Sequence, residues 1–153
     1  MRKYKIFIDE NLPRQLAIGL NILVQPQNKK DGIEIEILSI KDVDGEGERD
    51  EDWIPKVWQQ NGIVLTQDFR IQTQKHQQEL YKNNGVGILF FNPPSKGGFA
   101  YWDMVKQLVT RWDEIKQIVR KNKTPFAYRC SAKTKIEKIW WQFNYCFLHF
   151  VSH

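Results

Sequence analysis

With 153 residues, 41% of them hydrophobic and 27% charged, the chain has the length and composition of one soluble globular domain. No apolar run reaches the roughly 18 residues that span a bilayer, and no leader precedes the first predicted strand, so we expect a cytoplasmic protein without membrane contact. The two cysteines, Cys130 and Cys146, form neither a zinc motif nor a disulfide framework.

The first predicted element is a short buried strand, residues 4–8, which ends in two carboxylates, Asp9 and Glu10. Ligands of open α/β sheets bind just beyond the carboxyl ends of strands, where these two side chains would lie. The alternative is that Asp9 only helps to cap the helix that follows.

That helix is predicted for residues 12–23, with Asn11 as its N-cap and Pro13 in its first turn. Pro26 and the polar residues after it predict a loop. Residues 33–40 alternate between Ile and polar side chains, which indicates a half-exposed strand at the edge of a sheet.

Residues 42–52 hold seven Asp or Glu residues in eleven positions. Such a run is commonly a solvated loop. Here it leads into a helix predicted for residues 53–60, with Glu51 or Asp52 as its N-cap. Asp50 then lies just before the helix begins.

A second buried strand, residues 62–66, ends in Thr66 and is followed by Asp68. Asp68 therefore repeats the position of Asp9, one carboxylate just past a central strand. A helix is predicted for residues 71–83, with His76 on its polar face as a surface residue.

The remaining elements are a strand at residues 86–91, a long amphipathic helix at 99–119, and two strands at 126–130 and 136–143. Alternating strands and helices predict an α/β protein with a mainly parallel sheet. Residues 139–151 contain no Asp, Glu, Lys or Arg, which suggests either a buried strand or a contact with a second copy in a homodimer.

Three carboxylates, Asp9, Asp50 and Asp68, are expected to converge at the carboxyl edge of the sheet. Because like charges repel, such a cluster is stable mainly when a cation neutralises it. Hard oxygen ligands select Mg²⁺ or Mn²⁺, and a bound water can then attack a phosphodiester.

Basic residues concentrate in the last third of the chain, where residues 111–138 hold nine Lys or Arg and three acids. This segment either binds a polyanion or forms a solvated helix face. If it binds a nucleic acid, we expect phosphate contacts from Arg111, Arg120, Lys121 and Lys123.

Three stretches, residues 8–13 (IDENLP), 50–54 (DEDWI) and 64–68 (VLTQD), together resemble the PIN-like nucleases, close to the VapC-type toxin branch. Residues 123–128 (KTPFAY) are similar to a late strand of that branch. The resemblance covers about residues 4–130, with residues 131–153 as a basic and apolar extension of a single PIN-like domain, residues 1–153. It implies a three-layer fold and a metal-dependent endoribonuclease acting on RNA, often the toxin paired with an antitoxin protein.

By position, the resemblance makes Asp9, Asp50 and Asp68 the Mg²⁺ or Mn²⁺ ligands. Many relatives have an acid two residues after the Asp68 equivalent, where this chain has Arg70, which we expect to contact a phosphate instead. Polar residues expected to surround the metal are Glu10, Glu51, Asp52 and Thr66. Asn11 is a further RNA-contact candidate, and which of residues 50–52 faces the metal stays open.

Two other functions fit part of the sequence. A receiver-like phospho-acceptor domain would use Asp9 and Glu10 for Mg²⁺, Asp68 as acceptor and Lys123 as charge sensor. It also needs a Ser or Thr at the end of the next strand, where this chain has Phe91 and Asn92. A PIN-like module that binds RNA or a partner without cleaving is the other, because Arg70 replaces an acid.

Overall fold

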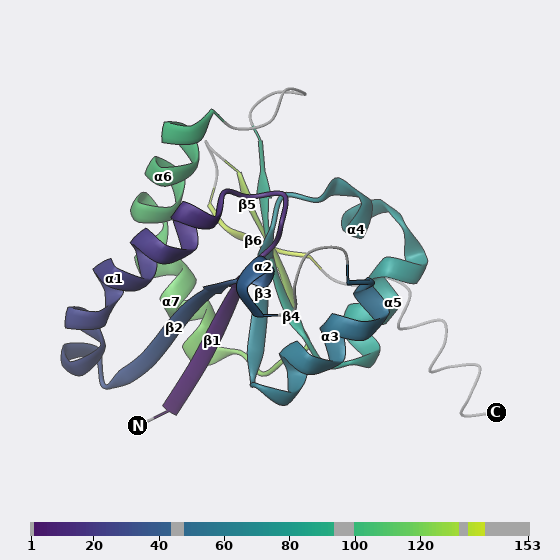
Figure 1. Ribbon diagram of the computed structural model, residues 1–153, viewed down its shortest axis with the longest axis horizontal. Helices are drawn as coiled ribbons and strands as arrows, with labels where there is room; N and C mark the ends of the chain where they lie inside the picture. The colour runs from purple at the N-terminus through teal and green to yellow at the C-terminus, as the bar shows by residue number, and fades with distance from the viewer. Residues whose placement is uncertain (1, 44–47, 94–99, 132–134, 140–153) are drawn as a thin grey trace.

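The computed structural model describes residues 2–43, 48–93, 100–131 and 135–139 (Figure 1). The strands are β1 (Arg2–Ile8), β2 (Ile33–Ser39), β3 (Gly62–Thr66), β4 (Gly87–Asn92), β5 (Ala127–Ser131) and β6 (Glu137–Lys138). The helices are α1 (Arg14–Asp31), α2 (Ile40–Val43), α3 (Asp50–Gln59), α4 (Phe69–Thr73), α5 (Lys75–Asn83), α6 (Tyr101–Thr110) and α7 (Trp112–Lys121).

The strands form one sheet in the order β2-β1-β3-β4-β5-β6. Neighbouring strands are parallel except β5 and β6, which are antiparallel. The predicted α/β class, the mainly parallel sheet and the C-terminal strand pair are therefore confirmed. The strand predicted for residues 136–143 is described only as far as residue 139, and the rest of the apolar tail lies outside the described residues.

The chain passes from β1 to β2 on one side of β1 and then returns to β3 on the other side. The carboxyl ends of β1 and β3 therefore flank the point where the winding direction reverses. In doubly wound folds, this is the place where ligands bind.

Helices cover both faces of the sheet, which gives three layers (Figure 1). Successive side chains of β1 alternate between the two cores: Ile6 and Ile8 pack with α1, α6 and α7, whereas Phe7 packs with α3 and α5. The same alternation turns Asp9 and Thr66 toward the face covered by α3 and α5.

Helix α1 is longer than predicted, because it continues through Pro26 to Asp31 and ends at Gly32, whose φ of 64° is left-handed. Two amide side chains of α1, one of them in this extra length, bind the outer edge of β2. Asn28 Nδ2 donates to the carbonyl of Ile35 at 3.1 Å, and Asn21 Oδ1 accepts from the N–H of Ile37 at 2.9 Å. The predicted edge position of β2 is confirmed, and two of its outer backbone groups, the carbonyl of Ile35 and the N–H of Ile37, have partners on α1.

The predicted starts of two helices are wrong. Pro13, not Asn11, occupies the N-cap position of α1, without a side-chain capping bond. Helix α3 begins at Asp50 after Arg49, so neither Glu51 nor Asp52 is its N-cap, and Pro55 lies inside the helix.

Two predicted helices are each divided into two. Residues 71–83 belong to α4 and α5, which meet at Gln74. The long helix at 99–119 is broken at Arg111 into α6 and α7. Arg111 Nη2 donates to the carbonyl of Ser131 at 2.8 Å, so this side chain ties the break to the end of β5.

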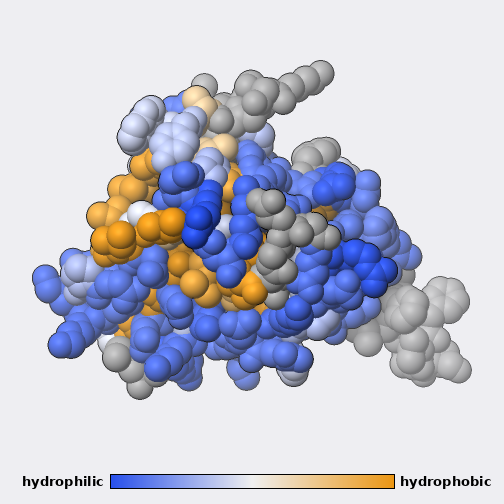
Figure 2. Space-filling model, in the orientation of Figure 1, coloured by the Kyte–Doolittle hydropathy of each residue, from blue (hydrophilic) through white to orange (hydrophobic). Residues whose placement is uncertain are grey.

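Hydrophobic residues gather on the surface over α1 and α6 (Figure 2). The exposed members are Ile18, Ile22, Leu23, Tyr101, Trp102 and Val109. None of the helices in the described part of the chain combines the length and the apolar character that crossing a bilayer requires.

Candidate metal-binding carboxylate rim

Asp9 is a buried carboxylate directly after β1, with only 8% of its surface exposed. Its backbone N–H continues the sheet by donating to the carbonyl of Leu65 at 3.0 Å. Burial raises the pKa of Asp9, although hydrogen bonds from Thr66 and from the backbone of Glu10 partly oppose that rise. The charges of Asp68 and Glu10 raise it further. The Asp9 carboxylate caps no helix, so the alternative of a purely capping role is rejected.

Thr66 joins Asp9 to the next strand end. Its hydroxyl, fully buried at the end of β3, donates to Asp9 Oδ2 at 2.7 Å and accepts from the backbone N–H of Asp68 at 2.9 Å. One side chain therefore fixes both a carboxylate and the loop that carries a second carboxylate.

Asp68 caps α4 and is also held by Arg70. The backbone N–H of Arg70 donates to Asp68 Oδ1 at 2.9 Å, and its Nη2 donates to Asp68 Oδ2 at 2.7 Å. Nε lies 3.1 and 3.2 Å from the two carboxylate oxygens. Burial alone would raise the pKa of Asp68, but the hydrogen bonds and charge of Arg70 outweigh burial and lower it.

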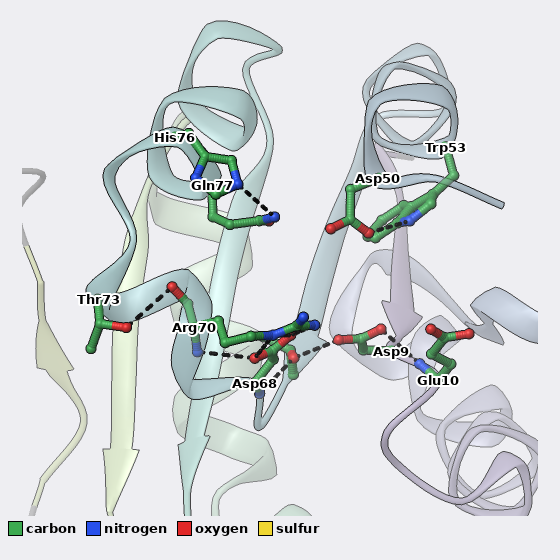
Figure 3. A network of polar contacts seen from close by, with 10 residues as sticks. Asp9, Glu10, Asp50, Trp53, Asp68, Arg70, Thr73, His76 and Gln77 are labelled. Atoms are coloured by element: carbon green, nitrogen blue, oxygen red, sulfur yellow. Dashed lines mark hydrogen bonds and ion pairs between the residues drawn. The ribbon is translucent and has the colours of Figure 1, made fainter. Parts of the chain in front are cut away.

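The Arg70 guanidinium also responds to the other two acids of this edge. The charges of Asp50 and Asp9 add to that of Asp68 in raising the pKa of Arg70. In Figure 3 the carboxylates of Asp9, Asp50 and Asp68 face a common space, with Arg70 over Asp68. A side-chain cation is thus built into an edge that would otherwise be strongly negative.

Asp50 begins α3, and its Oδ1 accepts a hydrogen bond from Trp53 Nε1 at 2.9 Å. The buried Trp53 ring packs edge-on against Tyr81, with 6.1 Å between the ring centroids. The Tyr81 hydroxyl is buried without a hydrogen-bond partner among the described residues. Burial raises the pKa of Tyr81 well above its usual value, and the charges of Asp9, Asp50 and Asp68 raise it further. Trp53 and Tyr81, which we call the aromatic floor, therefore contact this group of acids through Asp50 and lie near enough to Asp9 and Asp68 to respond to their charges.

The other polar residues predicted for this edge are more peripheral. Glu10, Glu51 and Asp52 are exposed, and Asp52 is paired with Arg49 at 3.1 Å. Asn11 is also exposed, and its carbonyl accepts from Gln67 Nε2 at 2.8 Å. Of the three acids in the first turn of α3, Asp50 is the one whose carboxylate is tied to the aromatic floor.

We call Asp9, Asp50 and Asp68 the carboxylate rim. Their hard oxygen donors fit Mg²⁺ or Mn²⁺. Burial and, to a smaller extent, the charges of Asp68 and Glu10 raise the pKa of Asp9, and a bound cation would oppose that rise. Among the residues described, however, no three His, Cys, Asp or Glu side chains lie close enough together to hold one ion. Metal binding therefore requires these side chains to draw together and Asp68 to release Arg70.

The predicted phosphate contacts do not lie beside the rim. Arg120 and Lys121 end α7, and Lys123 follows it, all three exposed at the amino edge of the sheet next to Arg2 and Lys3. Arg111 is instead engaged with Glu114 at 3.1 Å and with the end of β5. His76 is exposed on α5, in accord with its prediction as a surface residue.

Sequence analysis missed Trp53 and Tyr81. The spacing of Asp50 and Trp53 offered a signal, because residues three apart face each other on a helix. Tyr81 offered none, because its position under the rim depends on how α5 packs against β3 and β4.

Comparison with protein families adds one finding. A family model described as a PIN-like domain matches residues 4–93, which include most of β1, all of β2 to β4 and all three rim acids. Comparison with curated proteins and with solved structures gave no match. Since the family model covers more than half of the 153 residues, the chain belongs to the PIN-like domain family, whose members are generally nucleases that use divalent metals.

Proposed function

We propose that this chain is a Mg²⁺- or Mn²⁺-dependent endoribonuclease and that Asp9, Asp50 and Asp68 are its metal ligands. The observation that carries the proposal is the hydrogen-bonded connection from Asp9 through Thr66 to Asp68, which lies at the reversal point of the sheet with Asp50 facing it. Family membership supports the nuclease class.

Each group has a part in this chemistry. The ion would supply an activated water and counter the charge that builds up on the phosphate. Thr66 fixes the position of the Asp9 carboxylate relative to the loop that carries Asp68, and Trp53 holds the Asp50 carboxylate through a hydrogen bond. If Asp68 held the ion, Arg70 would lose its present partner and could bind a phosphate oxygen of the substrate.

The test is cleavage of a circular, mixed-sequence single-stranded RNA by the purified protein with Mg²⁺, Mn²⁺ or EDTA. A circle has no ends, so its cutting demonstrates endonuclease activity. We expect cleavage only with metal and none from Asp9→Asn or Asp68→Asn. Asp113→Asn, which removes an exposed acid of α7, is the matched control. Metal-independent cutting, or wild-type rates from either rim variant, would refute the assignment.

The finer part of the proposal is that the nuclease is the toxin of a toxin–antitoxin pair, neutralised by a partner protein. The exposed apolar residues over α1 and α6 support a protein partner, because patches of this kind commonly mark interfaces. Induced expression should arrest growth and Asp9→Asn should not. Equal growth of cells that express the wild type and cells that express Asp9→Asn would contradict the toxin proposal. The size of the purified protein in solution would show whether it is a homodimer.

One observation favours a second candidate, a PIN-like module that binds RNA or a partner without cleaving it. Arg70 already neutralises Asp68 with a forked ion pair, so the rim has a counter-cation of its own. The receiver-like alternative gains no such support. The strand order of this sheet is shared by several doubly wound folds, so it does not single out a receiver domain. Strand β4 also ends in Asn92, whereas a receiver domain needs Ser or Thr at that strand end.

A further inference from the structure

An open pocket of about 660 Å³ lies at the amino edge of the sheet, at the opposite end of the strands from the carboxylate rim. We call it the amino-edge pocket. Its walls come from the start of β1, the turn before β3, and the end of α7 with the segment that follows. The length of β1, seven residues, separates it from the rim by about 20 Å.

Five cationic side chains line this pocket, and none of its lining residues is acidic; the five are Arg2, Lys3, Arg120, Lys121 and Lys123. Only Lys3 has an acidic partner among the described residues, Glu34 at 3.7 Å, and both side chains are exposed. Asp31, the last residue of α1, does not line the pocket and is engaged by Lys116 at 2.9 Å. Most of the positive charge of the pocket is therefore not neutralised by described side chains and can interact with an anionic ligand.

The simplest alternative is that these cations only stabilise a helix end. Basic residues in a last turn interact favourably with the helix dipole, which accounts for Arg120 and Lys121. It does not account for Arg2 and Lys3 on β1, or for Lys123 beyond the helix. Cations from separate elements around one hollow indicate a shared anionic ligand.

Other lining groups narrow the ligand class. Tyr4 is half-buried and offers part of an aromatic ring. Two asparagines are fixed in place: Asn61 Nδ2 donates to the carbonyl of Lys3 at 3.1 Å, and Asn122 Oδ1 accepts from the Tyr128 hydroxyl at 3.0 Å. Cations, amides and an aromatic side chain are the groups that bind nucleotides, through phosphates and through stacking on the base. A volume of about 660 Å³ lies within the range of small-molecule sites.

We propose that the amino-edge pocket binds the phosphates of a nucleotide, separately from the carboxylate rim. That nucleotide is either free or part of a single-stranded RNA. If it is part of the RNA substrate, which rests on the proposed function, the pocket anchors the strand about 20 Å from the bond to be cut. It then contributes to RNA affinity and not to the chemical step.

The test measures binding by fluorescence anisotropy in EDTA, so that cleavage does not interfere. The probes are a labelled single-stranded oligoribonucleotide of mixed sequence, with AMP, ATP and adenosine as competitors. The variant is Arg120→Ala with Lys121→Ala. The matched control is Lys29→Ala with Lys30→Ala, which removes the same charge from the last turn of α1, outside the pocket.

We expect the pocket variant to weaken oligonucleotide binding about tenfold and to flatten the log–log salt dependence by about 1.4, since each lost phosphate contact accounts for about 0.7. The control should stay within about twofold of wild type. Lys123→Gln, on a different segment, should weaken binding in the same direction. Equal losses in variant and control would overturn the proposal.

The competitors identify the source of the nucleotide. Displacement by AMP or ATP but not by adenosine supports a free nucleotide, whereas no displacement by any of them supports an RNA strand. Displacement by adenosine as strong as by AMP would overturn the phosphate assignment. Because no measurement uses metal or cleavage, a chain that binds RNA here but never cuts it would refute the nuclease and leave the pocket standing.

Discussion

At Asp68 a guanidinium takes the role that a metal ion has in the proposed function. The sequence has Arg70 where many relatives have an acid, and from this we predicted that Arg70 contacts a phosphate. The structure shows Arg70 turned back onto its own neighbour, with its side chain 70% exposed and that of Asp68 17% exposed. A local ion pair of this kind cannot be predicted from the sequence, because a solvated Arg70 would be equally compatible with it.

Replacing Arg70 with Ala should strengthen Mn²⁺ binding by roughly five- to tenfold, because Asp68 becomes free and a positive charge leaves the vicinity of Asp9 and Asp50. Isothermal titration calorimetry of wild type and variant gives the comparison. Lys75→Ala removes a cation that is also exposed, on α5, and serves as the control. Unchanged or weaker Mn²⁺ binding in Arg70→Ala would show that Arg70 does not compete with the metal.

Asp9→Asn should raise the melting temperature in EDTA. Burial raises the pKa of Asp9, so at neutral pH its ionised form costs folding free energy that the amide does not. With saturating Mn²⁺ the order should reverse, since only the wild type retains the ligand. Thermal unfolding in both conditions provides the measurement, and a destabilised Asn variant in EDTA would argue against a strained carboxylate.

Cys130 should be inert toward alkylation in the folded protein. It is buried in β5, and burial raises the pKa of its thiol to about 12, so almost no thiolate forms at neutral pH. Peptide mass spectrometry after iodoacetamide treatment of the native and the denatured chain would show the protection. Rapid labelling of Cys130 in the native chain would mean that β5 opens readily.

Among the elements, α1 shows where sequence patterns succeed and where they fail. Its apolar spacing and the edge strand after it were predicted correctly, but the helix was ended too early, because Pro26 was taken as a terminator. The structure instead continues the helix to a left-handed Gly32, since its extra turns carry Gln25 and Asn28, whose side-chain amides donate to the carbonyl of Ile35 in β2. Such tertiary hydrogen bonds offset the cost of an internal proline, and no local pattern reports them.

Asn28→Ala should lower the free energy of unfolding by about 1–3 kcal/mol, because the buried carbonyl of Ile35 loses its close donor at 3.1 Å. Gln27→Ala, one residue away and exposed on the same helix, should change it by less than about 0.5 kcal/mol. Urea unfolding of the two variants would separate these outcomes. Equal stabilities would mean that the β2 edge does not depend on α1.

At the scale of the whole molecule, acidic and basic groups occupy opposite edges of one sheet. The acidic edge was predictable, because parallel strands direct their carboxyl ends to one side. The position of Arg120, Lys121 and Lys123 was not recognised. A helix that connects parallel strands runs back antiparallel to them, so the end of α7 lies at the amino edge. The sequence pattern identified the acidic and the basic residues, but it did not show that they lie at opposite edges of the sheet.

This separation predicts that the two edges act independently. Arg120→Ala with Lys121→Ala should leave Mn²⁺ affinity unchanged, and Asp9→Asn should leave the RNA affinity in EDTA within about twofold of wild type. In the variant that combines all three substitutions, the changes in the free energy of RNA binding should add to within about 0.5 kcal/mol, as is usual for sites more than about 10 Å apart. A larger coupling energy from the double-mutant cycle would show that one RNA contact spans both edges or that the sheet transmits a change.

The amide cover on β2 also bears on how this protein behaves when crowded with copies of itself. An uncovered outer strand offers a template on which another chain can add by backbone pairing, the route to domain-swapped and fibrillar assemblies. Here the side chains of Asn21 and Asn28 already occupy positions that an incoming strand would need, and Glu34 and Glu36 add charge along the strand. Growth of the sheet from this side would first require α1 to detach, so the helix acts as a safeguard against polymerisation.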